Sequence, residues 1–495
     1  MSWKSRLAYP FAKLIRRRVL AAAAQPHDAQ AKVLAQLRHL GGPTGFGESH
    51  GVGEVRTQAD LAQRVPLRDY EALRPWIDRV LEGERDVLWV GRPRFLAKTS
   101  GTTSGAKYIP ITKHSLPNHF GTARNALFNY YGRTGHGDWL DGKMIFLSGS
   151  PQLDSHGGIP TGRLSGISNH LIPSWVRRGQ LPSYATNCID DWERKLDAIV
   201  AETVGEDLRL ISGIPPWVQM YFERLLEATG KSSVLDVFPD FSMFVYGGVN
   251  YEPYRAQLEA LIGGRVASVE TYPASEGFIA FQDGEPGEGL LLNVDSGIYF
   301  EFVPLDQVGR DAPDRLGLRD VALDTDYALV LSSNAGLWGY TIGDTVRFVS
   351  LAPYRVVVSG RVKHFISAFG EHVIGKEVEE AMQAALRQNG GRVVEFHVAP
   401  QVSPPEGGAP YHEWFVEFGE RPASLAAFAK TLDSELQRQN IYYRDLRAGA
   451  VLREAVVTAV RSGAFRAYME SVGRLGGQNK VPRLADDRVV AEGLA

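Results

Sequence analysis

The chain has 495 residues, of which 44% are hydrophobic and 22% charged, and its formal net charge is −3. This length favours two or three domains, and the near-neutral charge gives no general attraction to nucleic acid or to an anionic membrane. Cys188 is the only cysteine, which excludes an intramolecular disulfide and a zinc site of several thiolates. No apolar run reaches the roughly 20 residues that a membrane span needs. We therefore expect a monomeric protein of the reducing cytoplasm.

The first 25 residues combine basic residues with an alanine-rich stretch. Lysine and arginine interrupt every apolar run there, so a secretory signal is not expected. The basic run from Lys13 to Arg18 predicts a surface helix, which we favour over contact with a membrane.

Residues 99–107 read TSGTTSGAK and lie between two strand-like runs, RFLA and YIPIT. Backbone N–H groups in a glycine-rich turn converge on anions, serine and threonine hydroxyls add donors, and Lys107 adds a positive charge. Only three residues separate Gly101 from Gly105, and an extended run follows, which excludes a P-loop. The pattern predicts a strand, a phosphate-binding loop and a second strand; a plain flexible hairpin is the alternative.

Helical and strand-like segments then alternate. Residues 190–204 and 216–229 have helical spacing, and the run DLRLISG between them predicts a short buried strand. The strand FSMFVYGG (241–248), a helix closed by Gly263 and Gly264, and the strand RVASVETY follow. This repetition predicts an α/β fold with ligand loops at the carboxyl ends of strands.

The amino-acid composition changes after residue 289. Residues 289–358 are rich in valine, tyrosine, phenylalanine and leucine, which predicts an antiparallel β-rich lobe. The rest of the chain predicts a small α+β domain. Its expected elements are a helix near 376–388, strands at 392–400 and 411–419, a helix near 425–438 and a last short strand and helix. The loop 401–410 is expected to be a hairpin connection inside it. We divide the chain into a large domain, 1–360, and a small domain, 361–495.

Three further stretches carry candidate site residues. TYPASEG (271–277) holds Tyr272, which can stack on a base, and Glu276, which can hold Mg²⁺ against phosphates. GYTIGDTVRF (339–348) holds Asp344, whose carboxylate can accept hydrogen bonds from ribose hydroxyls. GRVKHFISAFGEHVIGKEVEE (360–380) joins the two domains. Taken singly, each stretch has an ordinary structural explanation.

In their order and spacing these stretches resemble the motifs of the adenylate-forming superfamily of acyl-CoA synthetases, luciferases and peptide-synthetase adenylation domains. FVYGGV (244–249) is similar to the adenine-side segment, and YPASE to Tyr-Gly-x-Thr-Glu, from which Pro273 and Ser275 depart. Within the superfamily the chain is most similar to the auxin-responsive Gretchen Hagen family of acyl acid amido synthetases. VPLRDYEALRPWIDRVLEGE (65–84) and GGQNKVPRL (476–484) resemble stretches of that family.

The resemblance implies a two-step reaction with ATP and Mg²⁺. A carboxylic acid is converted into an acyl adenylate with release of pyrophosphate, and an amine, expected to be that of an amino acid, then takes the acyl group and releases AMP. It also implies roles for individual residues. Phosphates are assigned to Ser100, Gly101, Thr102, Thr103, Ser104 and Lys107; adenine to Gly247, Gly248 and Tyr272; the bound nucleotide as a whole to Ser275; Mg²⁺ to Glu276; ribose to Asp344 and Arg361; the hinge to Lys363; and the α-phosphate and carboxylate to Lys480.

Two other functions stay open at this point. An acyl-CoA ligase would share the first half-reaction, although such ligases usually carry Gly-Lys where this chain reads QNKVPR. A catalytically silent nucleotide-binding protein would keep the fold and lose the chemistry. GRLSG (162–166) does not match the nucleophile elbow of serine hydrolases, and His114, His119, His156 and His170 are expected to be surface or core residues.

Overall fold

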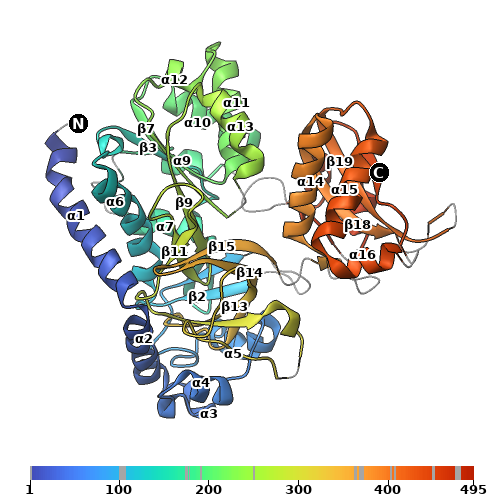
Figure 1. Cartoon of the computed structure of the whole chain (residues 1–495). Coiled ribbons are helices and arrows are strands. Elements are labelled where there is room, and N and C mark those ends of the chain that lie inside the picture. The colour runs from blue at the N-terminus through green and yellow to red at the C-terminus, as the bar shows by residue number, and fades with distance from the viewer. Residues whose placement is uncertain are drawn as a thin grey trace. The chain divides into compact units, whose positions relative to one another are not determined.

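The computed structural model describes most of the chain (Figure 1). The described residues are 3–99, 107–172, 177, 179–189, 192–248, 251–310, 312–361, 365–366, 373–401, 404–405, 408–448, 452–473, 481–485 and 487–494. Within them no helix combines the length and the hydropathy that crossing a lipid bilayer requires.

An 11-stranded sheet forms the centre of the larger part of the molecule, in the order β12-β13-β14-β15-β11-β10-β9-β8-β7-β3-β6. Its strands are β3 (Lys143–Phe146), β6 (Gln180–Leu181), β7 (Leu208–Ser212), β8 (Met243–Gly247), β9 (Ala267–Ala274), β10 (Gly277–Phe281), β11 (Leu290–Leu292), β12 (Ile298–Pro304), β13 (Asp326–Ser333), β14 (Tyr340–Leu351) and β15 (Tyr354–Arg361). The run from β6 to β9 is parallel, whereas β9, β10, β11 and β15 pair antiparallel. The predicted α/β part and the antiparallel lobe are therefore confirmed as two halves of one sheet.

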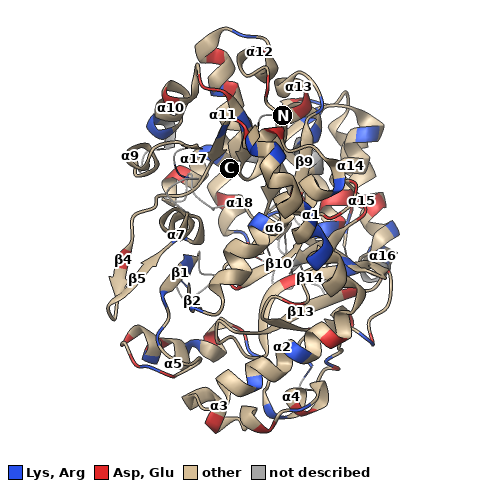
Figure 2. Ribbon diagram, turned by 90° about the vertical axis from the view of Figure 1, so that its left-hand side faces the viewer, with Lys and Arg blue, Asp and Glu red and all other residues tan. Residues whose placement is uncertain are grey.

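A smaller sheet has the order β2-β1-β5-β4. Its strands are β1 (Phe95–Thr99), β2 (Lys107–Ile111), β4 (Asp154–His156) and β5 (Ile159–Gly162). Figure 2 shows β1 and β2 between the helices α5 (Tyr70–Leu81) and α7 (Leu164–Leu171), which contact β2 and β1 respectively. Leu96, Ile109 and Ile111 are fully buried, so this sheet shares a core with α5.

Helices cover the two sheets, and their caps explain several of their ends. They include α1 (Trp3–Ala24), α2 (Pro26–Gly41), α3 (Gly45–Ser49), η1 (Val52–Glu54), α4 (Gln58–Arg64), η2 (Pro117–Gly121), α6 (Thr122–Thr134), η3 (Asp138–Leu140), α9 (Tyr184–Asn187), α10 (Trp192–Thr203), α11 (Pro215–Thr229), α12 (Val234–Val237), α13 (Glu252–Ile262) and η4 (Leu305–Gln307). The predicted helices at 190–204 and 216–229 are confirmed as α10 and α11. Gly263 ends α13 at a φ of 84°, a conformation that glycine adopts without a Cβ clash.

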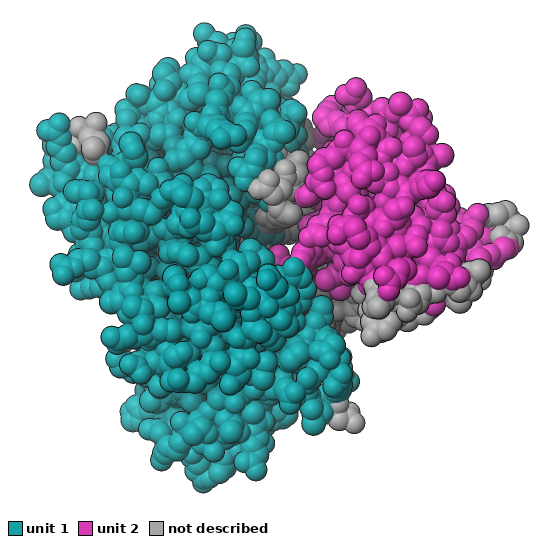
Figure 3. Space-filling model, viewed as in Figure 1, with its two compact units in different colours: residues 1–342, 347–357 teal, residues 343–346, 358–495 magenta. Residues whose placement is uncertain are grey.

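Two compact units divide the chain (Figure 3). Unit 1 is Met1–Ile342 with Arg347–Val357, and unit 2 is Gly343–Val346 with Val358–Ala495. The long segment of unit 2 begins at Val358, three residues before the predicted start of the small domain at residue 361. That these units act as separate functional domains stays a prediction.

Unit 2 contains the sheet β18-β19-β20, packed against helices. Its elements are β16 (Phe365–Ile366), β17 (Val373–Ile374), α14 (Gly375–Asn389), β18 (Arg392–Gln401), β19 (Tyr411–Glu420), α15 (Leu425–Gln439), α16 (Ile441–Ala448), β20 (Val456–Val460), α17 (Ala464–Ser471) and α18 (Val489–Leu494). β18 and β19 are antiparallel neighbours, which confirms the loop 401–410 as a hairpin connection. The sequence analysis did not predict α16.

Asp433 of α15 joins three elements of unit 2. Its buried carboxylate accepts hydrogen bonds from the Tyr443 hydroxyl at 2.7 Å, from Arg447 Nε at 3.0 Å and from the backbone N–H of Ala455 at 3.1 Å. Because a buried charge is costly without partners, this network holds α16 and the start of β20 against α15.

Candidate active site

The predicted phosphate-binding loop connects β1 to β2. These strands are antiparallel with Thr99 opposite Lys107, and residues 100–106, which include five predicted phosphate ligands, lie outside the described residues. Because β1 and β2 are both strands, the two predicted strands are confirmed and the exclusion of a P-loop holds, whereas phosphate binding between them stays a prediction.

Lys107, at the first position of β2, lies beside α5. Its Nζ is 5.7 Å from the centre of the Tyr70 ring, and the Tyr70 hydroxyl accepts a 2.9 Å hydrogen bond from the backbone N–H of Tyr108. Asp69 caps the helix by accepting a hydrogen bond from the N–H of Ala72, which places Tyr70 in the first turn. The side chain of Tyr70 thus links the stretch 65–84 to β2.

Glu276 lies in the tight turn between β9 and β10. Ala274 pairs with Gly277, so Ser275 and Glu276 are the two residues of a hairpin turn, and both side chains are half-buried. The Tyr340 hydroxyl lies 3.4 Å from Glu276 Oε1. Tyr340 is 1% exposed; burial raises its pKa above the ordinary range, and the Glu276 carboxylate raises it further. The hydroxyl therefore stays protonated and donates to Glu276.

Backbone pairing with the stretch 65–84 holds Tyr340 at this point. The N–H of Arg68 donates to the carbonyl of Gly339 at 2.9 Å, and the N–H of Thr341 donates to the carbonyl of Arg68 at 2.8 Å. Gly339 has a φ of 55°, and a Cβ there would lie 2.8 Å from the Pro66 carbonyl oxygen, so only glycine fits. Three stretches that the sequence analysis singled out therefore meet around Tyr340 and Glu276.

Gly247 and Gly248 end β8 next to β9. Gly247 pairs with Thr271, and a Cβ on Gly247 would lie 2.2 Å from the Thr271 carbonyl oxygen. Gly248 has a φ of 78°. Both glycines are at the carboxyl edge of the parallel strands, where open α/β sheets bind ligands. Tyr272, the next residue on β9, is 6% exposed, and its stacking on adenine stays a prediction.

The remaining predicted residues belong to unit 2. Asp344 is 7% exposed and lies on the part of β14 assigned to that unit. Beside it, Ser359 donates to Thr345 across a 3.0 Å hydrogen bond between hydroxyls. Arg361 ends β15, with its side chain outside the description, as are Lys363 and Lys480. Their predicted roles stay predictions.

Glu276 is the one carboxylate that the sequence analysis assigns to Mg²⁺, and this role stays a prediction. Among the described residues no group of three or more histidine, cysteine, aspartate or glutamate side chains could hold a metal ion. Mg²⁺ commonly uses one or two protein carboxylates and completes its shell with phosphate oxygens and water. A single half-buried carboxylate agrees with that pattern.

Asn118 of η2 was missed by the sequence analysis. Its side chain donates to the Phe278 carbonyl at 3.1 Å and accepts from the Phe278 N–H at 2.7 Å, so it holds β10 just after Glu276. The neighbouring His119 is 5% exposed, and burial lowers its pKa to about 4. Its ring is neutral at pH 7, as the prediction of a core histidine requires. No local sequence pattern marks Asn118, because its partner is 160 residues away.

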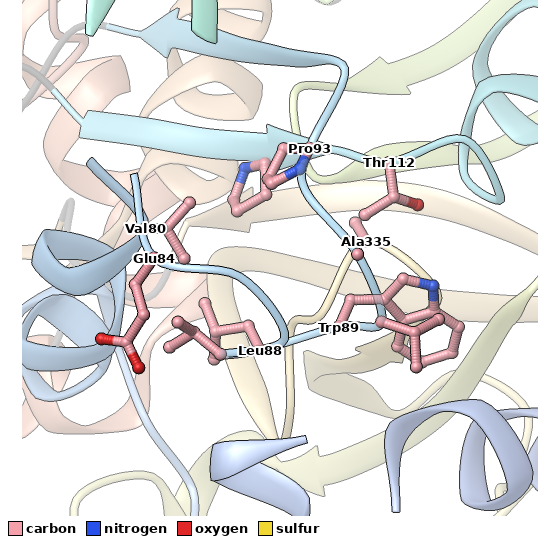
Figure 4. Close-up of a pocket in the computed structure, with 11 residues that line it drawn as sticks. Val80, Glu84, Leu88, Trp89, Pro93, Thr112 and Ala335 are labelled. Carbon is pink, nitrogen blue, oxygen red and sulfur yellow. The ribbon is translucent and has the colours of Figure 1, made fainter. Parts of the chain in front are cut away.

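A pocket in unit 1 is lined by residues other than those predicted for the site (Figure 4). It has a volume of about 260 Å³, including space open to solvent, and Glu84 on its rim is bonded to Arg79 at 2.8 Å. Its lining is Val80, Glu84, Val87, Leu88, Trp89, Val90, Gly91, Pro93, Pro110, Thr112 and Ala335. None of them is a predicted site residue.

The architecture is that of solved acyl acid amido synthetases. The structure of AtGH3.15 acyl acid amido synthetase in complex with 2,4-DB superposes with a TM-score of 0.81 over 98% of this chain and 95% of that one, at 16% identity. The sequence matches three domains of one family: the GH3 family N-terminal domain over residues 15–170, the central domain over 291–361 and the C-terminal domain over 376–489. The chain belongs to the GH3 family.

Curated relatives have a higher sequence identity to this chain, over shorter stretches of it. Jasmonoyl--L-amino acid synthetase JAR4 of Nicotiana attenuata is 21% identical over 383 residues, covering 64% of this chain and 66% of that protein. Indole-3-acetic acid-amido synthetase GH3.3 of Arabidopsis thaliana is 26% identical over 261 residues, covering 48% and 44%. The chain thus spans less than two thirds of the length of these relatives.

Proposed function

We propose that this protein activates a carboxylic acid with ATP and transfers the acyl group to an amine, most simply an amino acid, as an amido synthetase. The observation that carries the proposal is the meeting of three motif stretches at the Tyr340–Glu276 hydrogen bond. Membership of the GH3 family and the fold of AtGH3.15 support it.

In the first step a carboxylate oxygen of the acid attacks the α-phosphorus of ATP. The new P–O bond forms as the bond to the β-phosphate breaks, which gives the acyl adenylate and pyrophosphate. In the second step the amine nitrogen attacks the acyl carbon and loses a proton, and the C–O bond to AMP breaks. Neither step needs a covalent enzyme intermediate, so catalysis depends on positioning and on offsetting phosphate charge.

Four residues have proposed tasks in this reaction. Glu276 would hold Mg²⁺, which when bound offsets the charge of the phosphates. Tyr340 donates to Glu276 and orients its carboxylate. Lys107 starts the strand that follows the phosphate-binding loop and supplies a positive charge there. Asp344 would accept hydrogen bonds from the ribose hydroxyls. A cytoplasmic location agrees with this use of ATP and remains part of the proposal.

Exchange of labelled pyrophosphate into ATP tests the first step, with a panel of carboxylic acids and with Mg²⁺ varied. Glu276→Gln should lower acid-dependent exchange by roughly a hundredfold or more, as expected when charge stabilisation is lost. Glu227→Gln is the matched control, because that carboxylate is 78% exposed on α11. Wild-type exchange in Glu276→Gln would contradict the assignment.

Mass spectrometry of the products tests the second step. An amide with an added amino acid supports the proposal, whereas a CoA thioester identifies the acyl-CoA ligase alternative. Binding of ATP without exchange for any acid of the panel identifies a silent nucleotide-binding protein.

A further inference from the structure

The helix α1 lies on the outside of unit 1, and one of its faces is held by α6 (Figure 1). Ala12 is fully buried, and a Cβ on Gly132 would lie 2.7 Å from its carbonyl oxygen, so the two helices pack closely. The Tyr131 hydroxyl donates to the Ser5 carbonyl at 2.7 Å. These contacts determine which side of α1 faces outward.

The outward side of α1 carries a stripe of exposed apolar side chains. Trp3 is 69% exposed, Leu7 70%, Phe11 40% and Leu14 43%. Their spacing of four, four and three residues places them on one face of a helix. Single exposed leucines are ordinary, but a row of four large apolar side chains on one helix marks a contact surface. We call these four residues the α1 stripe.

The same helix is strongly basic. It holds six lysine and arginine residues and no acidic residue, whereas the whole chain has a net charge of −3, so the rest of the chain sums to −9 (Figure 2). By helical spacing Arg6 and Arg17 lie on one side of the α1 stripe, Lys4 lies on the other side and Arg18 lies in line with it, and all four are exposed. The positive charge is therefore concentrated where the apolar side chains are exposed.

We propose that α1 binds the surface of an anionic phospholipid bilayer. A helix with tryptophan, phenylalanine and leucine on one side and flanking lysine and arginine lies in the plane of such a surface, with its apolar side chains among the acyl chains and its cations at the headgroups. A nucleic acid would pair with the arginines and leave the α1 stripe in water. The surface of unit 1 away from α1 is acidic on balance, so the helix also sets the orientation of binding.

The sequence analysis favoured an ordinary surface helix at residues 13–18. Residues 13–18 include only one residue of the α1 stripe, Leu14, because Trp3, Leu7 and Phe11 precede them. The structure adds the observation that Trp3, Leu7 and Leu14 are exposed, whereas Phe11, at the edge of the α1 stripe, packs edge-on against Phe128 of α6 at 5.1 Å. Binding at this surface needs no membrane-spanning segment and leaves the residues around Tyr340 unaltered.

Co-sedimentation of the full chain with lipid vesicles tests the proposal. Vesicles of phosphatidylcholine with about a third phosphatidylserine should pellet the protein at low salt, and vesicles of phosphatidylcholine alone should not. The triple variant R6Q/R17Q/R18Q should bind about a hundredfold more weakly, since each basic residue near a surface contributes roughly a fivefold factor. L7Q/L14Q should also release the protein, because the apolar contact is lost.

Matched variants separate this effect from a general change of charge or fold. K231Q/R265Q/R310Q removes three exposed basic residues elsewhere in unit 1, and L323Q replaces a leucine that is 48% exposed. Both should pellet like the unaltered protein. Circular dichroism and pyrophosphate exchange should be the same in all variants, because every substituted side chain is on the surface.

Three outcomes would overturn the proposal. The first is equal binding to neutral and anionic vesicles, or binding to neither. The second is an R6Q/R17Q/R18Q variant that pellets like the unaltered protein. The third is a dimer in light scattering that L7Q/L14Q converts into a monomer, which would assign the α1 stripe to a second copy of the chain.

Discussion

Removal of one hydroxyl, in Tyr340→Phe, tests the arrangement around Glu276. The ring stays in place and is 1% exposed, so packing is retained and the free energy of unfolding should change by less than about 1 kcal/mol. What is lost is the hydrogen bond to Glu276 Oε1. A hydrogen bond to a charged group contributes about 1.5–3 kcal/mol, but at 3.4 Å this one is longer than usual and Glu276 is half-buried. We therefore expect Tyr340→Phe to raise the activation free energy by about 1 kcal/mol, which corresponds to a roughly fivefold lower kcat/KM for pyrophosphate exchange.

A double-mutant cycle shows whether that loss passes through Glu276. In the Glu276→Ala background the hydroxyl has no carboxylate to orient, so Tyr340→Phe should have no further effect on exchange. Tyr354→Phe is a matched control, because it also removes a buried hydroxyl, which donates to the Leu318 carbonyl at 2.6 Å. That variant should lower stability and leave kcat/KM unaltered. Additive losses in the Tyr340 and Glu276 double variant would refute the positioning role.

Further predictions concern unit 2. Asp344→Asn should weaken ATP and AMP alike, by roughly tenfold or more in calorimetric Kd, because both nucleotides carry the same ribose hydroxyls; unaltered affinities would leave Asp344 a structural residue. Lys480→Ala should lower adenylation by roughly a hundredfold while preformed acyl adenylate still reacts with the amine, and Lys363→Pro should do the reverse in single-turnover assays. Equal losses in both steps would argue against a hinge. Asp433→Ala should lower the free energy of unfolding in urea by about 3–5 kcal/mol, because the buried Tyr443 hydroxyl and Ala455 N–H lose their acceptor and Arg447 loses its carboxylate partner; a loss below about 1 kcal/mol would contradict the bracing role.

Local patterns in the sequence were sufficient for many elements. The helix α13 ends where Gly263 adopts a positive φ, and the glycine-rich loop is bounded by β1 and β2 as its apolar flanks predict. Such features depend on interactions between residues a few positions apart, so a short window of sequence contains their cause. The order of the motif stretches was likewise sufficient to indicate the family.

The contacts that assemble the candidate site were decided by the tertiary structure. Tyr340 and Glu276 are 64 residues apart, and Arg68 and Thr341 are 273 residues apart. No spacing rule links such residues, because their approach depends on how β14, β9 and the segment before α5 pack in one core. The same holds for α1, where the sequence contains the basic and apolar residues but only the packing of Ala12 against α6 leaves Leu7 in water.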